Sequence, residues 1–255
     1  MIPYKKRARA LRTKKGRSVY RQTLIEGVRL VEDAVASGAD ITVLYHVQPQ
    51  PGERLDQVIA MAIARGITCV ELSANEIDDL SDTETPQGCV AIAAIPDWKI
   101  DDLSGRTGDI VILDGVRDPG NAGTLLRAAE AAGARGALAI GGSVELSNPK
   151  VVRSSMGAYF RLPWIENLSV KAAIQTCIDL DTEVCLTNAK SGDAASTIRD
   201  ANNLAIVIGG EAAGASAEWT DIEHKTICIP MADPVESLNA AVAGAVLLFR
   251  HTWRG

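Results

Sequence analysis

Ile110-Val111-Ile112-Leu113-Asp114-Gly115 opens the stretch that decides the fold of this chain, and Asp118-Pro119-Gly120-Asn121-Ala122-Gly123-Thr124-Leu125-Leu126-Arg127 closes it. The apolar run predicts a buried strand. Asn121 is a good N-cap, so we expect a helix from Asn121 to Ala132 that carries Arg127. A strand that is apolar throughout, followed by a helix, is typical of a parallel sheet covered on both faces. Taken alone, the stretch is better explained by an ordinary junction in which Asn121 caps and Arg127 is solvated.

The alternation of strands and helices runs along most of the chain. After residue 110 we expect further strands at 137–140, 184–187, 204–208 and 226–229, and helices at 170–178 and 237–250. Before residue 96 we expect helices at 24–37 and 55–64 and strands at 41–47, 67–72 and 88–95. Residues 97–108 are rich in Gly, Ser and Asp and look like a linker. The sequence therefore predicts an α/β protein with domains at 1–96 and 109–255.

Composition excludes several classes of protein. The 255 residues are 47% hydrophobic and 23% charged, and no apolar run approaches the ~20 residues that span a bilayer. No secretory signal is visible at the N-terminus. The histidines and the five cysteines are scattered without CxxC spacing, so a metal site and a disulfide framework are both poorly supported. We expect a reduced, cytoplasmic compartment without metal.

Positive charge is concentrated at the N-terminus. The net charge is -6, yet residues 1–29 hold ten Lys or Arg and one acid, so that this segment is +9 and the remainder is -15. Such asymmetry gives one end of the chain a phosphate-binding potential. A solvated flexible tail is the alternative, and a transit peptide is a third interpretation because the first 25 residues contain no acid.

Two further motifs follow predicted strands. Gly209-Gly210-Glu211-Ala212-Ala213-Gly214 comes after the strand at 204–208, where paired glycines allow a sharp turn or close approach to a ligand. Ile229-Pro230-Met231-Ala232-Asp233-Pro234-Val235-Glu236-Ser237-Leu238-Asn239 ends the last strand and opens the last helix. A tight turn with an acidic cap explains the first motif equally well, and capping by Ser237 or Asn239 explains the end of the second.

In order and spacing, the three motifs together resemble those of the SpoU (TrmH-like) branch of the SPOUT RNA methyltransferases. The resemblance implies a C-terminal trefoil-knotted domain that pairs as a homodimer. Thr23-Leu24-Ile25-Glu26-Gly27 and Thr85-Pro86-Gln87-Gly88 resemble the small L30e-like substrate-binding domain of these enzymes. The implied activity is S-adenosylmethionine-dependent methylation of a ribose 2′-oxygen, which we expect on 23S ribosomal RNA. Methylation of tRNA and a non-catalytic RNA-binding module of the same fold are the alternatives.

The resemblance also implies roles for individual residues. The catalytic set is Asn121, Arg127, Glu211, Ser237 and Asn239, and the cofactor-binding set is Gly209, Gly210, Ile229, Met231 and Leu238. Arginine stays charged, so Arg127 would hold phosphate or stabilise an oxyanion and would not act as a base. Asn148-Pro149-Lys150-Val151-Val152-Arg153 also resembles the family, and the expected RNA contacts are Lys5, Lys6, Arg7, Arg9, Arg17 and Arg153. Asp233 stands where the family commonly has glycine.

The last predicted helix has no polar face. Ala240 to Phe249 are ten consecutive apolar residues, and a helix that is apolar all round must be buried on every side. Its small residues, among them Ala243 and Gly244, would let a second backbone approach closely. We therefore expect a dimer through this helix, with burial inside the monomer as the alternative.

Overall fold

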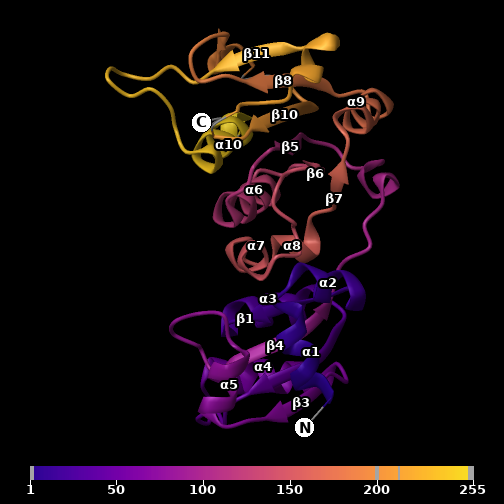
Figure 1. Ribbon diagram of the computed structural model, residues 1–255, viewed down its shortest axis with the longest axis vertical. Coiled ribbons are helices and arrows are strands. Elements are labelled where there is room, and N and C mark those ends of the chain that lie inside the picture. Colours follow the sequence, from indigo (N-terminus) through magenta and orange to yellow (C-terminus); the bar gives the residue numbers. More distant parts are fainter. Residues whose placement is uncertain (1–2, 199–200, 212, 252–255) are drawn as a thin grey trace. The chain divides into compact units, whose positions relative to one another are not determined.

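The computed structural model describes residues 3–198, 201–211 and 213–251, and the chain divides into two compact units (Figure 1). Unit 1 is the chain up to Asp97 together with Ser147–Phe160, and unit 2 is Trp98–Leu146 together with the chain from Arg161 onward. Within the described ranges, no helix is long and apolar enough to cross a membrane.

Unit 1 is a four-stranded sheet with helices around it. Its elements are α1 (Pro3–Leu11), α2 (Lys14–Tyr20), β1 (Gln22–Glu26), α3 (Val28–Ser37), β2 (Ile41–His46), α4 (Arg54–Ala64), β3 (Thr68–Glu71), α5 (Ala74–Leu80), β4 (Cys89–Ala94), α7 (Pro149–Ser154) and most of α8 (Ala158–Arg161). The strand order is β1-β4-β2-β3. β4 runs antiparallel to β1 and β2, and β2 runs parallel to β3.

The helix predicted from residue 24 is wrong in its first turn. Leu24 and Ile25 belong to β1, where they pair with Ile92 and Ala91 of β4. Gly27 has a φ of 98°, which ends the strand and lets α3 begin at Val28. A strand buried on both faces has apolar residues at successive positions. Some of these positions also match the spacing of a helix, which is why the sequence predicted a helix here.

The basic N-terminal segment is not a flexible tail. It forms α1 and α2, and Ala8 and Leu11 of α1 are fully buried in the core of unit 1. The Thr13 hydroxyl caps α2 by accepting from the amide of Gly16. Arg17 is also buried, and its guanidinium donates to the carbonyls of Leu11 and Arg12. Ala8 and Leu11, which lie three residues apart on one face of α1, and the buried Arg17 pack this segment against the rest of unit 1.

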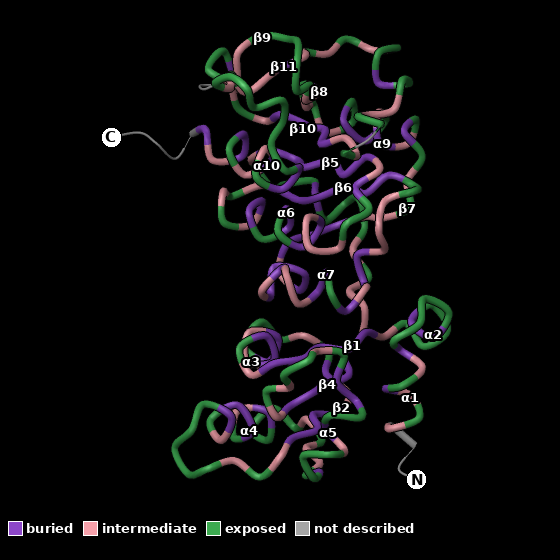
Figure 2. Tube along the Cα trace, turned by 60° about the vertical axis from the view of Figure 1, so that its left-hand side comes forward, coloured by how far each residue is buried: buried purple, intermediate pink, exposed green. Residues whose placement is uncertain are grey.

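Unit 2 is a seven-stranded sheet in which every described pair of neighbouring strands is parallel. Its elements are η1 (Ile100–Leu103), β5 (Ile110–Asp114), α6 (Pro119–Ala131), β6 (Gly136–Ile140), β7 (Trp164–Leu168), α9 (Val170–Asp179), β8 (Glu183–Thr187), β9 (Asp193–Ala194), η2 (Ala195–Ile198), β10 (Leu204–Gly209), η3 (Ala217–Asp221), β11 (Lys225–Cys228), α10 (Ala240–Leu248) and η4 (Phe249–His251). The order is β7-β6-β5-β10-β8-β11-β9. The central strands β5, β6 and β10 are buried almost throughout (Figure 2). The predicted parallel α/β sheet is confirmed, and β7 and β9 are strands that the pattern did not reveal.

The sheet brings two of the motifs to one edge. β5 and β10 are neighbours, and their register places Asp114 opposite Gly209. The loops that leave these two strands therefore start side by side at the carboxyl end of the sheet, where ligands bind in open α/β folds.

Packing departs from the expected boundaries in two places. Leu103 lies inside the expected linker, yet it is fully buried in the core of unit 2. Ser147–Phe160 follows β6 in sequence but packs in unit 1, where the Thr23 hydroxyl donates to the carbonyl of Ser147 at 2.7 Å.

The last helix uses its small residues inside the monomer. α10 packs on α6 and β10 (Figure 1). A Cβ on Gly244 would lie 2.3 Å from Leu125 Cδ2 and 3.5 Å from Ile208 Cδ1, so the close approach expected for a second chain is made here by α6. The outward face carries Val242 and Val246 instead, which are 50% and 47% exposed.

A buried ion pair ties the end of the chain to the start of β5. Arg250 Nη2 donates to Asp109 Oδ1 at 2.9 Å and to the carbonyl of Ala201 at 3.0 Å, and its Nε donates to the carbonyl of Ile198 at 3.0 Å. Both charged side chains are buried. A buried ion pair is tolerated only when hydrogen bonds satisfy its remaining polar atoms, and the carbonyls of Ile198 and Ala201 do this for Arg250.

Candidate active site

The first motif is organised by Asp118, which is the N-cap of α6. Its Oδ1 accepts from the amide of Asn121 at 2.7 Å, and Pro119 is the first residue of the helix. The expectation that Asn121 caps the helix is therefore wrong. Because another residue does the capping, the Asn121 side chain is free to make contacts outside its own helix.

Three predicted catalytic residues, one from each motif, are joined in a line. Asn239 caps α10, since its Oδ1 accepts from the amides of Ala241 at 2.9 Å and Val242 at 3.3 Å. Its Nδ2 donates to Asn121 Oδ1 at 2.9 Å, and Asn121 Nδ2 donates to Glu211 Oε1 at 2.7 Å. An amide oxygen only accepts and an amide nitrogen only donates, so the helix cap fixes the direction of every bond in this relay.

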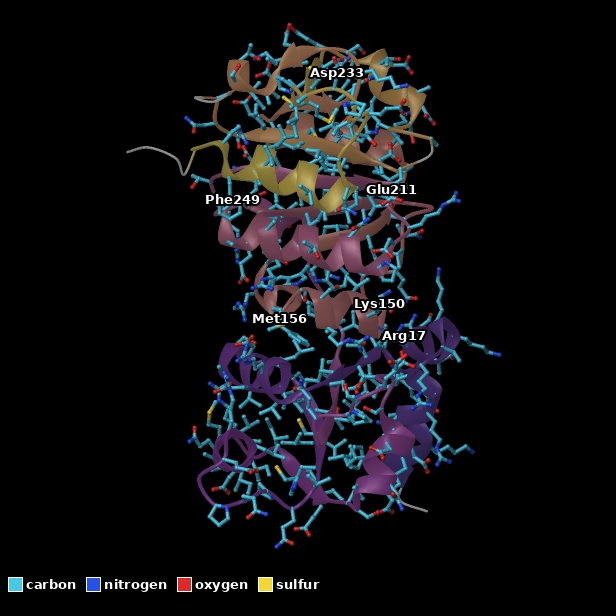
Figure 3. All side chains as sticks on the ribbon, turned by 90° about the vertical axis from the view of Figure 1, so that its left-hand side faces the viewer. Arg17, Lys150, Met156, Glu211, Asp233 and Phe249 are labelled. Carbon is cyan, nitrogen blue, oxygen red and sulfur yellow. The ribbon has the colours of Figure 1, made fainter. Side chains whose placement is uncertain are left out.

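A buried carboxylate that sequence reasoning missed holds the loop after β10. Asp114 ends β5 and accepts from the amide of Ser216 at 2.6 Å, from its hydroxyl at 2.9 Å and from Trp219 Nε1 at 2.9 Å. These bonds anchor the segment that carries Glu211, which Figure 3 labels. The sequence signal that could have identified Asp114 is its position, since it is an acidic residue directly after the apolar run at 110–113.

A cavity of about 210 Å³ opens beside this relay. All five predicted cofactor-binding residues line it, as do Glu211 and Ser237. Gly209 and Gly210 leave no room for a side chain: a Cβ on Gly209 would lie 2.3 Å from the Gly214 carbonyl carbon, and one on Gly210 would lie 2.5 Å from the Gly115 oxygen. The apolar part of the wall is formed by Ile208, Ile227, Ile229, Leu238 and Leu247. Such a wall, with backbone amides and a few polar groups at its edge, suits a flat aromatic ring with polar substituents.

A second cavity, of about 660 Å³, shares part of that wall. Gly209, Gly210 and Glu211 line both cavities, and the second also includes Asp118, Asn121 and Arg117. Glu211 therefore borders both cavities, and its side chain can contact a molecule bound in either of them.

Two predicted positions lie away from these cavities. Arg127 is exposed on α6, six residues beyond Asn121, and lines neither cavity. Six residues turn a helix through roughly 600°, so the two side chains leave α6 on different faces. Asp233 is exposed in the loop before α10 and also lines neither cavity (Figure 3).

The predicted RNA contacts differ in how available they are. Lys5 forms an ion pair with Glu76, and Lys5 together with the amide and hydroxyl of Ser73 lowers the pKa of that carboxyl to about 2. Arg9 pairs with Asp79 at 3.2 Å, and the Arg7 guanidinium lies 5.1 Å from the centre of the Tyr20 ring. Arg17 is not available to contact RNA, because it is buried and its guanidinium serves the packing of α1 and α2. Exposed cations of residues 1–29 without an ion pair among the described residues are Lys6, Arg12, Lys14, Lys15 and Arg29.

The described residues contain no group of His, Cys, Asp and Glu side chains that could hold a metal ion. The five cysteines are free, and burial raises the pKa of the Cys89 thiol to about 12 and that of Cys177 to about 11.

Residues 109–249 match the SpoU rRNA methylase family, and residues 3–91 match the MRM3-like substrate binding domain. The chain belongs to the SpoU rRNA methylase family. The predicted family and the predicted order of a substrate-binding unit before a SPOUT methyltransferase unit are thereby confirmed.

Several members of this family are similar over nearly the whole chain. The 23S rRNA (guanosine(2553)-2′-O)-methyltransferase RlmP of Bacillus subtilis is 29% identical over 94% of this chain and 92% of its own length. The 23S rRNA (adenosine(1067)-2′-O)-methyltransferase of Streptomyces laurentii is 30% identical over 95% and 90%. The AdoMet-bound rRNA methyltransferase from Sinorhizobium meliloti superposes with a TM-score of 0.85, at 31% identity, over 98% of this chain and 94% of that structure.

Proposed function

We propose that this protein transfers a methyl group from S-adenosylmethionine to a ribose 2′-oxygen of 23S ribosomal RNA. The observation that carries the proposal is the relay from Asn239 through Asn121 to Glu211, because it joins one residue of each family motif beside the cavity that the cofactor-binding residues line. Relatives that act on 23S rRNA and match nearly end to end support the substrate class. The AdoMet-bound neighbour supports the cofactor.

S-adenosylmethionine brings a methyl group already activated on a positively charged sulfur, so the protein has mainly to align the reactants and stabilise charge. The apolar wall of the smaller cavity, with Ile229 and Leu238, would hold the adenine ring. Asn121 fixes one oxygen of Glu211 and leaves Oε2 without a partner among the described residues. That oxygen is placed to accept a hydrogen bond from the ribose hydroxyl and to orient its lone pair toward the methyl group.

Negative charge develops on the ribose oxygen as its proton leaves, and Arg127 is the proposed cation that stabilises it. Arg127 lies away from Glu211 along α6. Its exposure leaves it available to a site that a second copy of the chain completes. A homodimer through α10 is therefore part of the proposal, and the exposed Val242 and Val246 support it, since paired apolar side chains on one helix face favour a protein partner.

We also propose that the C-terminal segment threads a loop and forms a trefoil knot. β11 lies in the sheet between β8 and β9, while the chain joining β8 to β10 passes outside it through β9. The segment after β11 returns to pack α10 on β10, and Arg250 contacts the carbonyls of Ile198 and Ala201 in that connecting loop. For the compartment, we propose the cytoplasm, where free cysteines stay reduced.

The test measures methyl transfer by the purified protein from radiolabelled S-adenosylmethionine to two substrates, 23S rRNA and tRNA. Both RNAs are prepared without exposure to this enzyme, so that the target nucleotide is unmethylated. We expect label in 23S rRNA only, at a nucleotide whose 3′ linkage becomes resistant to alkaline hydrolysis. Label confined to tRNA would favour the second substrate class, and label on bases would contradict ribose methylation. Protein that binds S-adenosylhomocysteine but methylates neither RNA would contradict the proposal.

A further inference from the structure

Unit 1 contains a cavity of about 510 Å³ that has no part in the site described above. All of its lining residues belong to this unit: Glu26, Gly27, Arg29, Leu30, Thr83, Thr85, Gln87, Arg153 and Met156. They come from the end of β1, the start of α3, the loop before β4 and the segment around α7. Two arginines and one buried acid make the cavity cationic.

One wall is the first turn of α3. Its N-cap is Gly27, which has no side chain to cap the helix, and the Val28 amide donates to Gln87 Oε1 at 3.2 Å. The amides of Arg29 and Leu30 have no intrahelical acceptor, because the ladder begins with the bond from Val31 to Gly27. Both residues line the cavity, so the positive end of the α3 dipole faces it.

A second wall presents Arg153. The Nη1 atom of Arg153 is buried and has no hydrogen-bond partner among the described residues. Its nearest carboxylate oxygen is Glu26 Oε2, at 3.7 Å. A buried donor without a hydrogen-bond acceptor is costly, so an anionic ligand that reached Nη1 would be favoured, and the side chain is exposed enough (32%) for a ligand to reach it.

Glu26 forms an ion pair with Arg153, but 3.7 Å is too long for a hydrogen bond, so it leaves the Nη1 donor unsatisfied. Its Oε1 accepts from the hydroxyls of Ser81 and Thr83, and its Oε2 accepts from the amide of Asp82 at 3.0 Å. The carboxylate thus holds the loop after α5 and partly offsets the charge of Arg153. Arg29 is exposed and makes no ion pair with any described residue, so the cavity retains a net positive charge.

We propose that this cavity binds a backbone phosphate of the substrate RNA, held by Arg29, Arg153 and the free amides of α3. The inference rests on the proposed function only in taking RNA as the ligand. Two guanidinium groups beside a helix N-terminus suit a phosphate, and the remaining volume admits the attached sugar. Arg153 comes from Ser147–Phe160, which lies within the sequence matched by the methylase family but packs in unit 1. A segment of the methylase sequence therefore supplies a phosphate-binding arginine to the substrate-binding unit.

The experiment measures binding of the full-length protein to 23S rRNA fragments at several salt concentrations. Arg29→Gln and Arg153→Gln are compared with Lys150→Gln, an exposed position on α7 outside the cavity (Figure 3). Each arginine variant should weaken binding and reduce the slope of log K against log salt by about 0.7–0.9, the contribution of one phosphate contact. The lysine variant should change neither, and S-adenosylhomocysteine affinity should be unaltered in all three.

Unchanged affinity and slope in Arg29→Gln would overturn the proposal, because Arg29 is exposed and its loss leaves the fold intact. An equal effect of Lys150→Gln would also overturn it by reducing the cavity to general surface charge. The result is independent of methyl transfer: arginine-dependent RNA binding without catalysis would contradict the proposed activity and leave the phosphate cavity standing.

Discussion

Replacing Asn121 by aspartate tests the relay with almost no change in size. The new side chain still accepts from Asn239 Nδ2, but it has lost the donor that holds Glu211 Oε1 at 2.7 Å. Two carboxylates now meet at that distance. At neutral pH both are charged and repel each other, so Glu211 should turn away from the orientation that the relay imposes.

The expected loss follows from the bond that is removed. A hydrogen bond to a charged group contributes about 1.5–3 kcal/mol. Because Glu211 is exposed and water replaces part of the lost donor, we take the lower end, about 1.5 kcal/mol, which is about a tenfold fall in kcat/KM. As the pH falls, the two carboxylates share one proton, the donor returns, and the deficit should shrink.

The assay is methyl transfer to 23S rRNA by Asn121→Asp, Asn121→Ala and wild-type protein between pH 5.5 and pH 8.5. The ratio of Asn121→Asp to wild type should rise as the pH falls, while the ratio for Asn121→Ala should stay flat, since alanine cannot regain a donor. S-adenosylhomocysteine affinity serves as the control for an intact cofactor cavity. A wild-type rate for Asn121→Asp at pH 8.5 would refute the role of the relay.

Three other substitutions give separate tests. Arg127→Ala should lower kcat by about 10²–10³-fold without changing S-adenosylhomocysteine affinity, and near-normal turnover would remove Arg127 from the mechanism. Val246→Asp should give a one-chain mass in light scattering at an unchanged melting temperature, and a dimer that persists in this variant would place the interface elsewhere. Gly244→Ala should instead lower the free energy of unfolding by about 1–3 kcal/mol, because its methyl group clashes with Leu125. Glu76 has its pKa lowered from 4.5 to about 2 by Lys5 and Ser73, so its stabilising contribution is present above about pH 4.5 and is lost as the pH falls toward 2. Glu76→Gln should flatten the pH dependence of the melting temperature in that window, and an unaltered dependence would deny a role to the contacts of Glu76 with Lys5 and Ser73.

The sequence located the site better than it located the caps. Each motif follows a predicted strand, so residues such as Gly209 and Glu211 could be expected at one edge of the sheet, and family resemblance supplied their roles. The cap of α6 was misplaced although the sequence contained the answer. Proline is favoured as the first residue of a helix, which makes Asp118 the cap and leaves Asn121 for the relay.

Other features depend on contacts between distant residues, which local pattern does not reveal. Leu24 satisfies both helical spacing and a doubly buried strand, and its pairing with Ile92 decides between them. Ser147 contacts Thr23, 124 residues earlier, and that contact places its segment in unit 1. The burial of Arg17 is likewise visible only once α1 and α2 are packed.

Asn239 caps the final helix and also begins the relay, so one side chain serves both the completion of the fold and the assembly of the reactive centre. A chain in which α10 has not formed therefore also lacks an oriented Glu211. Such a chain can hold its substrate-binding unit and all seven strands of the second sheet, yet its relay is incomplete. Activity thus depends on the folding of α10, and local unfolding of this one helix should abolish methyl transfer while the sheet is still intact.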